Sequence, residues 1–183
     1  MKIFGIDPGS DRTGFGCVEI DGSRHRLVSS GAISTAALDD FSHKLLTIHS
    51  RLTTLLQECG PDCVAIESLF YSNNVRSALK LGHARGVAML AAAEARVPIV
   101  EYTPTEVKRA VVGYGRAEKQ QVQQMVKLIL GLLEVPTPHD AADALAVAIC
   151  HAHSASPVAS DAAVVRSRTK AVTSWRSYRP AGS

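Results

Sequence analysis

The stretch MKIFGIDPGS, residues 1–10, begins with a short apolar run that is typical of a strand buried on both faces. A Pro-Gly pair follows Asp7 directly, so the chain must turn there. The strand therefore carries a carboxylate to its tip, where charge is costly unless a cation or a hydrogen-bond donor meets it. Asp7 either caps this turn or belongs to a cation site.

Carboxylates occupy comparable settings further along the chain. The stretch CVAIE, residues 63–67, repeats the pattern of a short apolar strand that ends on an acid, Glu67. Asp140 and Asp143 are spaced i, i+3, about 5–6 Å apart on one face of a helix, and lie in its first turn, where the helix dipole stabilises acids. They could be ordinary helix-terminal acids. However, the helix continues as ALAVA, so we expect it to be buried and its two acids to repel each other without a cation.

Hydrophobic periodicity predicts the remaining elements. We expect strands at 13–20, 24–34 and 97–102, a hairpin turn at Asp21-Gly22, and helices at 39–59, 74–95, 104–112, about 116–133 and 140–152. This order predicts an α/β fold with a mixed five-stranded sheet, the first three strands antiparallel and the first strand central, with helices on both faces. Gly82 and Gly86 would let another helix approach closely, either within the subunit or across a dimer.

Such a sheet would bring the four acids together. If Asp7 and Glu67 end adjacent parallel strands, they emerge at the same edge, and the helix start with Asp140 and Asp143 has only to pack there. Carboxylate oxygens suit Mg²⁺ or Mn²⁺ better than zinc. Two such ions about 3.5–4 Å apart serve in-line phosphoryl displacement, in which one activates the attacking water and the other stabilises the leaving oxygen.

Composition indicates one globular domain. The chain has 183 residues, of which 46% are hydrophobic and 20% charged. There is no apolar run of about 18 residues and no signal region, so we expect a cytoplasmic protein without a membrane partner. The four cysteines have no CxxC spacing and should be reduced core residues, not disulfide or zinc ligands.

The last segment differs in charge from the rest. Residues 151–183 carry five basic residues against one aspartate, a net charge of +4, which leaves −1 for the first 150 residues. We expect a basic, disordered tail over 157–183. It either attracts a polyanion weakly or only keeps the protein soluble.

Short motifs over nearly all of residues 1–153 occur in the order of one known family. They are IDPGS (6–10) with TGFG (13–16), IE (66–67) with Phe70, SALKLG (77–82), ARGV (84–87), VK (107–108), VVG (111–113), AEK (117–119) and DAADALA (140–146). On these motifs the chain resembles the RuvC crossover junction endodeoxyribonucleases of the RNase H-like superfamily. The resemblance implies a nuclease domain over 1–156 and assigns Asp7, Glu67, Asp140 and Asp143 as its metal-binding catalytic acids.

The resemblance also implies an activity. Members of this family are homodimers that bind four-way Holliday junction DNA during homologous recombination and DNA repair. They hydrolyse one phosphodiester in each of two strands of like polarity and leave symmetric, ligatable nicks. Two Mg²⁺ ions per subunit are implied, with Mn²⁺ as a substitute, and the RuvA–RuvB branch-migration complex is the implied partner.

Further DNA-binding residues follow from the same motifs. Phe70 would stack on an unpaired base at the crossover, although a loop aromatic can also pack onto the core. Lys108 and Lys119 match lysines that contact the phosphate backbone, and Arg76 and Lys80, one helical turn apart, would extend the same track. On their own, surface lysines are usually only solvated.

His139 precedes Asp140 directly. It would position water or a phosphate oxygen near the metals, or it is a loop histidine without such a role. The family pattern is loosest here and in the tail.

Two rival functions remain. The Asp-Pro-Gly turn with its hairpin also resembles the phosphate loop of actin-like ATPases, but 183 residues leave no room for the second lobe of that fold. A non-catalytic protein that binds four-way junctions is the other alternative. Four clustered acids would weaken its hold on DNA unless metals neutralised them, which favours catalysis.

Overall fold

A mixed five-stranded sheet forms the centre of the computed structural model, which describes residues 1–68 and 75–155. Its strands lie in the order β3-β2-β1-β4-β5. Their bounds are β1 (Lys2–Asp7), β2 (Arg12–Asp21), β3 (Arg24–Ser34), β4 (Cys63–Glu67) and β5 (Ile99–Tyr102). β1 pairs antiparallel with β2 and parallel with β4, while β2 and β3 are antiparallel and β4 and β5 parallel. The predicted fold class and the central position of the first strand are confirmed.

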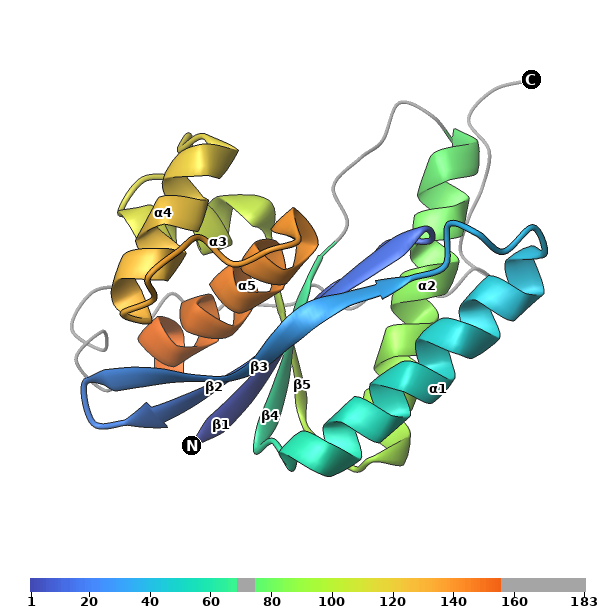
Figure 1. Ribbon diagram of the computed structural model, residues 1–183, viewed down its shortest axis with the longest axis horizontal. Helices are drawn as coiled ribbons and strands as arrows, with labels where there is room; N and C mark the ends of the chain where they lie inside the picture. The colour runs from blue at the N-terminus through green and yellow to red at the C-terminus, as the bar shows by residue number, and fades with distance from the viewer. Residues whose placement is uncertain (69–74, 156–183) are drawn as a thin grey trace, which may run out of the picture.

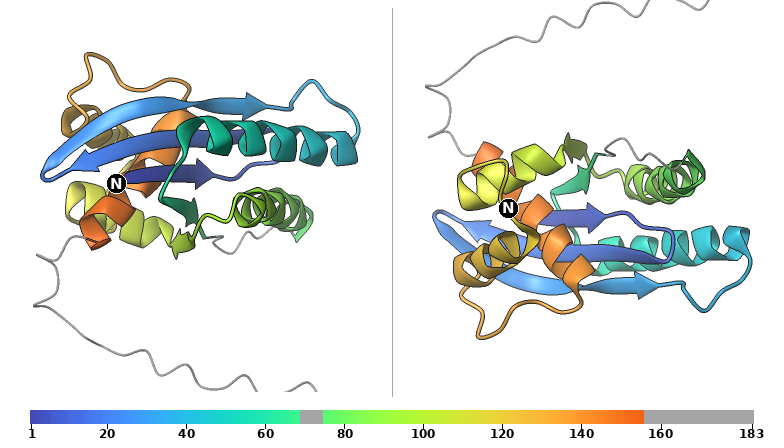
Figure 2. Two further views of the ribbon diagram at one scale, coloured as in Figure 1. Left: turned by 90° about the horizontal axis from the view of Figure 1, so that it is seen from below. Right: turned by 90° about the horizontal axis from the view of Figure 1, so that it is seen from above.

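Helices cover both faces of this sheet, as predicted. The helices α1 (Phe41–Cys59) and α2 (Val75–Glu94) lie on one side. On the other side lie α3 (Pro104–Val112), α4 (Lys119–Ile129) and α5 (His139–Ala155). Figures 1 and 2 show these two groups on opposite sides of the strands.

Several element ends differ from the predicted ones because caps decide them. Asp40 caps α1 by accepting hydrogen bonds from the backbone N–H groups of Ser42 and His43, so the helix begins at Phe41 and not at 39. Glu118 and Gln121 form a capping box, so α4 begins at Lys119 and not near 116. It ends at Ile129, before Gly131 with a left-handed φ of 63°.

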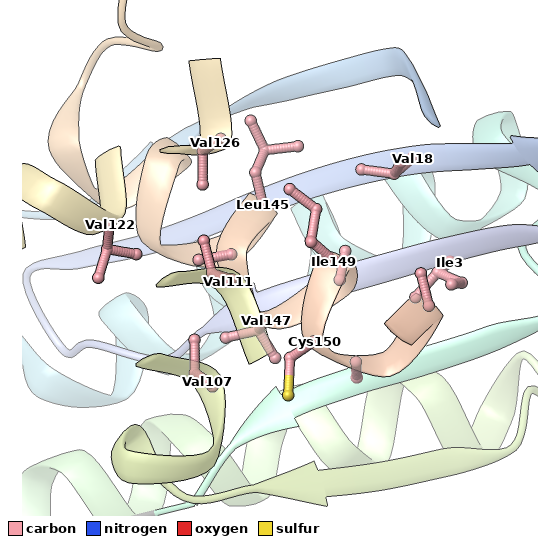
Figure 3. Packing of buried hydrophobic residues seen from close by; sticks show 14 of the residues in the cluster. Ile3, Val18, Val107, Val111, Val122, Val126, Leu145, Val147, Ile149 and Cys150 are labelled. Carbon is pink, nitrogen blue, oxygen red and sulfur yellow. The ribbon is translucent and has the colours of Figure 1, made fainter. Parts of the chain in front are cut away.

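The face with α5 holds one of two apolar cores. Ile3 and Val18 of the sheet pack there against Leu145 and Ile149 of the helix (Figure 3). At Gly5 of β1 a Cβ atom would lie 2.0 Å from the Ala144 carbonyl oxygen. The predicted burial of the last helix is confirmed, and its Ala-rich face rests directly on the sheet backbone.

The second core lies between the sheet and α1 and α2. Ile48 and Leu52 of α1 are fully buried in it. The face of α2 that packs on the core is its alanine stripe, Ala84, Ala88, Ala91 and Ala92. Val75, Leu79 and Leu90 of α2 are exposed instead, while Val87 and Met89 are partly buried against the core.

Two predictions from composition can be compared with the described residues. All four cysteines are buried and unpaired, as predicted. Within 1–68 and 75–155, no helix has the length and apolar character needed to cross a membrane.

Candidate active site

Asp7 and Glu67 lie side by side at one edge of the sheet. They are the last residues of β1 and β4, which pair in parallel up to Ile6 and Ile66. Burial raises the pKa of Asp7 to about 8, and the charges of Glu67, Asp143 and Asp140 add to this rise. Burial also raises the pKa of Glu67, with Asp143 adding to it and Lys119 opposing it. Both acids therefore lie where further negative charge is unfavourable.

The start of α5 brings Asp140 and Asp143 to the same edge. Gly14 of β2 stands opposite Asp7 in the strand register. A Cβ atom at Gly14 would lie 2.0 Å from the carbonyl oxygen of Asp140, so only glycine permits this approach. The four predicted acids come from β1, β4 and α5, and each of the other three raises the pKa of Asp7. They therefore converge as the sequence predicted.

Two cations of the chain itself contact these acids. The Lys119 Nζ atom, at the start of α4, lies 2.5 Å from Asp143 Oδ2. An Arg12 guanidinium nitrogen, at the start of β2, lies 3.7 Å from Asp140 Oδ2. Partial burial lowers the pKa of Lys119, but its hydrogen bond to Asp143 and the charges of the acids outweigh this and raise it. The acid cluster is thus partly neutralised from two sides.

A cavity of about 240 Å³ opens beside Glu67 and Asp143. Lys108 and Lys119 line it, and its apolar walls are Pro104, Val107, Val122 and Ala146. The charge of Lys108 also lowers the pKa of Glu67. Both lysines predicted to meet phosphate therefore border the acids.

The donor set suits hard divalent cations, because it consists of carboxylates without histidine or cysteine. In the described part of the chain, no three Asp, Glu, His or Cys side chains are arranged closely enough to enclose a metal ion as they stand. Lys119 and Arg12 each pair with one of the acids. The residues present fit Mg²⁺ or Mn²⁺ on condition that Asp143 exchanges Lys119 for the ion.

The other predicted DNA-binding residues lie apart from the acids or outside the description. Arg76 and Lys80 are exposed on α2, and Lys80 Nζ lies 5.8 Å from the centre of the Phe41 ring. His139 is exposed and is the first residue of α5. Phe70 lies outside the described residues.

Arg12 is the residue at this site that the sequence analysis missed. Its side chain is 56% exposed and points at Asp140, 128 positions away in the chain. The available signal was its place three residues after the Asp-Pro-Gly turn, at the start of the strand that returns past Asp7.

The raised pKa of Asp7 predicts a pH-dependent stability of the metal-free protein. Between the ordinary value of 3.8 and about 8, the folded protein holds a proton on Asp7 that the unfolded chain has released. Stability therefore falls as pH rises through this window. We therefore compare the unfolding free energies of Asp7→Asn and wild type. The advantage of Asp7→Asn should grow by about 2–4 kcal/mol as the pH rises from about 5 to about 8.

Urea unfolding in EDTA measures this gain. Asp39→Asn, at an exposed aspartate outside the acid cluster, serves as the control and should unfold with the same pH dependence as wild type. An equal difference between Asp7→Asn and wild type at both pH values would contradict the prediction.

Comparison with known proteins identifies the family of the chain. The family model described as crossover junction endodeoxyribonuclease RuvC matches residues 3–151. The protein of that name from Ruminiclostridium cellulolyticum is 53% identical over 84% of this chain and 93% of its own length. The one from Pelobacter propionicus is 51% identical over 98% of this chain and 100% of its own length. A structure of Thermus thermophilus RuvC in complex with Holliday junction substrate is 36% identical, with a TM-score of 0.77, covering 84% of this chain and 94% of that one. The chain therefore belongs to the RuvC family of crossover junction endodeoxyribonucleases.

Proposed function

We propose that this protein resolves Holliday junctions by hydrolysing one phosphodiester in each of two strands of like polarity, during homologous recombination and DNA repair. The convergence of Asp7, Glu67, Asp140 and Asp143 at one sheet edge carries this proposal. Family membership supplies the substrate, and the acid cluster supplies a reason to expect cleavage as well as binding.

The four acids hold two Mg²⁺ ions, with Mn²⁺ as a substitute, in each subunit. Such ions make an attacking water more acidic and stabilise the negative charge on the leaving oxygen. The residues of the chain provide the rest. Lys108 and Lys119 hold the DNA phosphate beside the acids, and Lys119 becomes available for this contact once it leaves Asp143.

Further contacts extend along the DNA. Arg76 and Lys80 meet the backbone on the α2 side, and Phe70 stacks on an unpaired base at the crossover. His139 positions water or a phosphate oxygen next to Asp140. Residues 1–156 form the nuclease domain, 157–183 form a basic tail, and the RuvA–RuvB complex is the partner in the cytoplasm.

A second copy of the chain covers the exposed apolar face of α2. A groove of about 420 Å³ runs along this face and is lined by Leu45, Leu79, Gly82, Gly86, Val87 and Leu90. A Cβ atom at Gly86 would meet nothing within 4 Å, so packing inside the subunit does not explain this glycine. Leu79 and Leu90 are 60% and 52% exposed. Two equivalent cuts need two equivalent sites, which a symmetric dimer provides.

We expect the double variant Leu79→Glu/Leu90→Glu to be monomeric, because four buried glutamates at a two-fold interface would be costly to desolvate. Light scattering measures the mass, and a cruciform plasmid distinguishes paired from single nicks. Leu128→Glu, at an exposed leucine of α4, is the control and should stay dimeric. A double variant that remains dimeric would place the interface elsewhere.

Cleavage of a synthetic mobile four-way junction tests the function itself. Wild type with Mg²⁺ should give paired, symmetric nicks that a ligase seals, and should leave a linear duplex of the same sequence intact. Tight junction binding without cuts in either Mg²⁺ or Mn²⁺ would instead favour the non-catalytic binding protein.

A further inference from the structure

Arg12 lies on the side of the acid cluster opposite to Lys119. β2 runs antiparallel to β1, and Asp7 pairs with Gly14, so Arg12 lies beyond the end of β1 at the site edge. Arg12 and Gly14 are two residues apart on a strand and share the face that α5 covers. Arg12 thus borders the acids from the β2 side, where it pairs with Asp140. Lys119 borders them from the α4 side, where it pairs with Asp143.

The contact between Arg12 and Asp140 leaves most of the guanidinium free. Its 3.7 Å separation exceeds the roughly 2.7–2.9 Å of a charge-assisted hydrogen bond. The arginine side chain is 56% exposed, and an exposed pair of this kind contributes little to stability. A guanidinium carries five N–H donors in a planar fork that matches phosphate oxygens. Arg12 can therefore bind a second anion.

Any DNA strand that brings a phosphate to the acids must pass one or both of these flanks. Four carboxylates repel that strand, so cations on each side are needed to hold it in place. Lys108 and Lys119 serve the α3 and α4 side. Within residues 1–68 and 75–155, Arg12 is the basic residue that forms an ion pair with the acids from the β2 side.

We propose that Arg12 binds a backbone phosphate of the junction on the β2 side of the acid cluster, next to the phosphate that is cut. This inference rests on the proposed function, because it takes four-way junction DNA as the ligand. Arg12 is a DNA-binding residue here and exchanges Asp140 for the phosphate when the complex forms.

The salt dependence of binding tests this contact apart from catalysis. We would measure junction affinity in Ca²⁺ over about 50–300 mM NaCl for wild type, Arg12→Gln and Arg12→Lys. One lost phosphate contact should weaken binding about tenfold and reduce the slope of log K against log salt by about 0.9. Arg12→Lys should keep the slope. Arg26→Gln is the control, because Arg26 pairs with Glu19 on the sheet and is exposed to a similar degree.

An unchanged slope in Arg12→Gln would overturn the proposal. The proposal would also fail if Arg12→Gln changed the Mn²⁺ affinity of the DNA-free protein but left the salt dependence of junction binding unchanged. Arg12 would then only hold Asp140 in place. If wild type binds junctions without cutting them, the nuclease function is refuted. The salt dependence of binding would still show whether Arg12 contacts a phosphate.

Discussion

Replacing Asp7 by Asn is expected to abolish junction cleavage while junction binding persists. The substitution keeps the size of the side chain and removes the carboxyl group whose pKa all three other acids raise. We expect the single-turnover rate in Mg²⁺ to fall by about a thousandfold or more, because metal binding and charge stabilisation are lost together. Binding should persist, because Lys108 and Lys119, the proposed phosphate contacts beside the acids, are unchanged.

Two measurements on the same synthetic four-way junction check this prediction: cleavage by rapid quench in Mg²⁺ and in Mn²⁺, and affinity by fluorescence anisotropy. The matched control is Asp39→Asn, at an exposed aspartate that should leave both quantities unchanged. A rate within tenfold of wild type would mean that Asp7 only caps the Pro-Gly turn. Loss of binding together with cleavage would point to a folding defect.

The acids could be predicted from local sequence because each ends or begins an element in a recognisable way. Asp7 and Glu67 follow short apolar strands, and Asp140 and Asp143 open an apolar helix. Whether the four acids converge depends on the order of the strands in the sheet. The number and spacing of the elements allow only a few such orders. The family motifs then agreed with the topology.

The apolar residues of α2 show what periodicity leaves open. A stripe of apolar residues indicates that one face is buried, without saying against what. On α2 the small alanines pack on the core, and the larger Leu79 and Leu90 face outward.

The two cations of the site could not be found from spacing. Lys119 reaches Asp143 from a helix start that was itself predicted about three residues too early. Arg12 reaches Asp140 across 128 positions. Contacts of this kind depend on the residue at which a loop ends and a helix begins. The capping box at Glu118 decides the start of α4, but several neighbouring residues are also plausible starts in the sequence.

Gly5→Ala is expected to damage the fold and the site together. The added Cβ atom would lie 2.0 Å from the Ala144 carbonyl oxygen and 2.9 Å from the Ala148 nitrogen, both backbone atoms of α5. No side-chain rotation can relieve this clash, so α5 must shift away from β1. We expect a loss of about 3 kcal/mol or more, which for a chain of this size lowers Tm by about 6–12 °C.

The same shift should lower cleavage beyond any loss of folded protein, because α5 carries two of the acids and β1 carries a third. A displacement of about 1 Å at a reacting centre can cost about a hundredfold in rate. Thermal unfolding and single-turnover cleavage at about 25 °C, well below Tm, separate the two effects. Gln57→Ala is the control, because Gln57 is exposed on α1 and alanine favours the helix, so Tm should not fall. If Gly5→Ala unfolds like wild type, α5 does not rest on the backbone of β1, and the acids would have to converge by another packing.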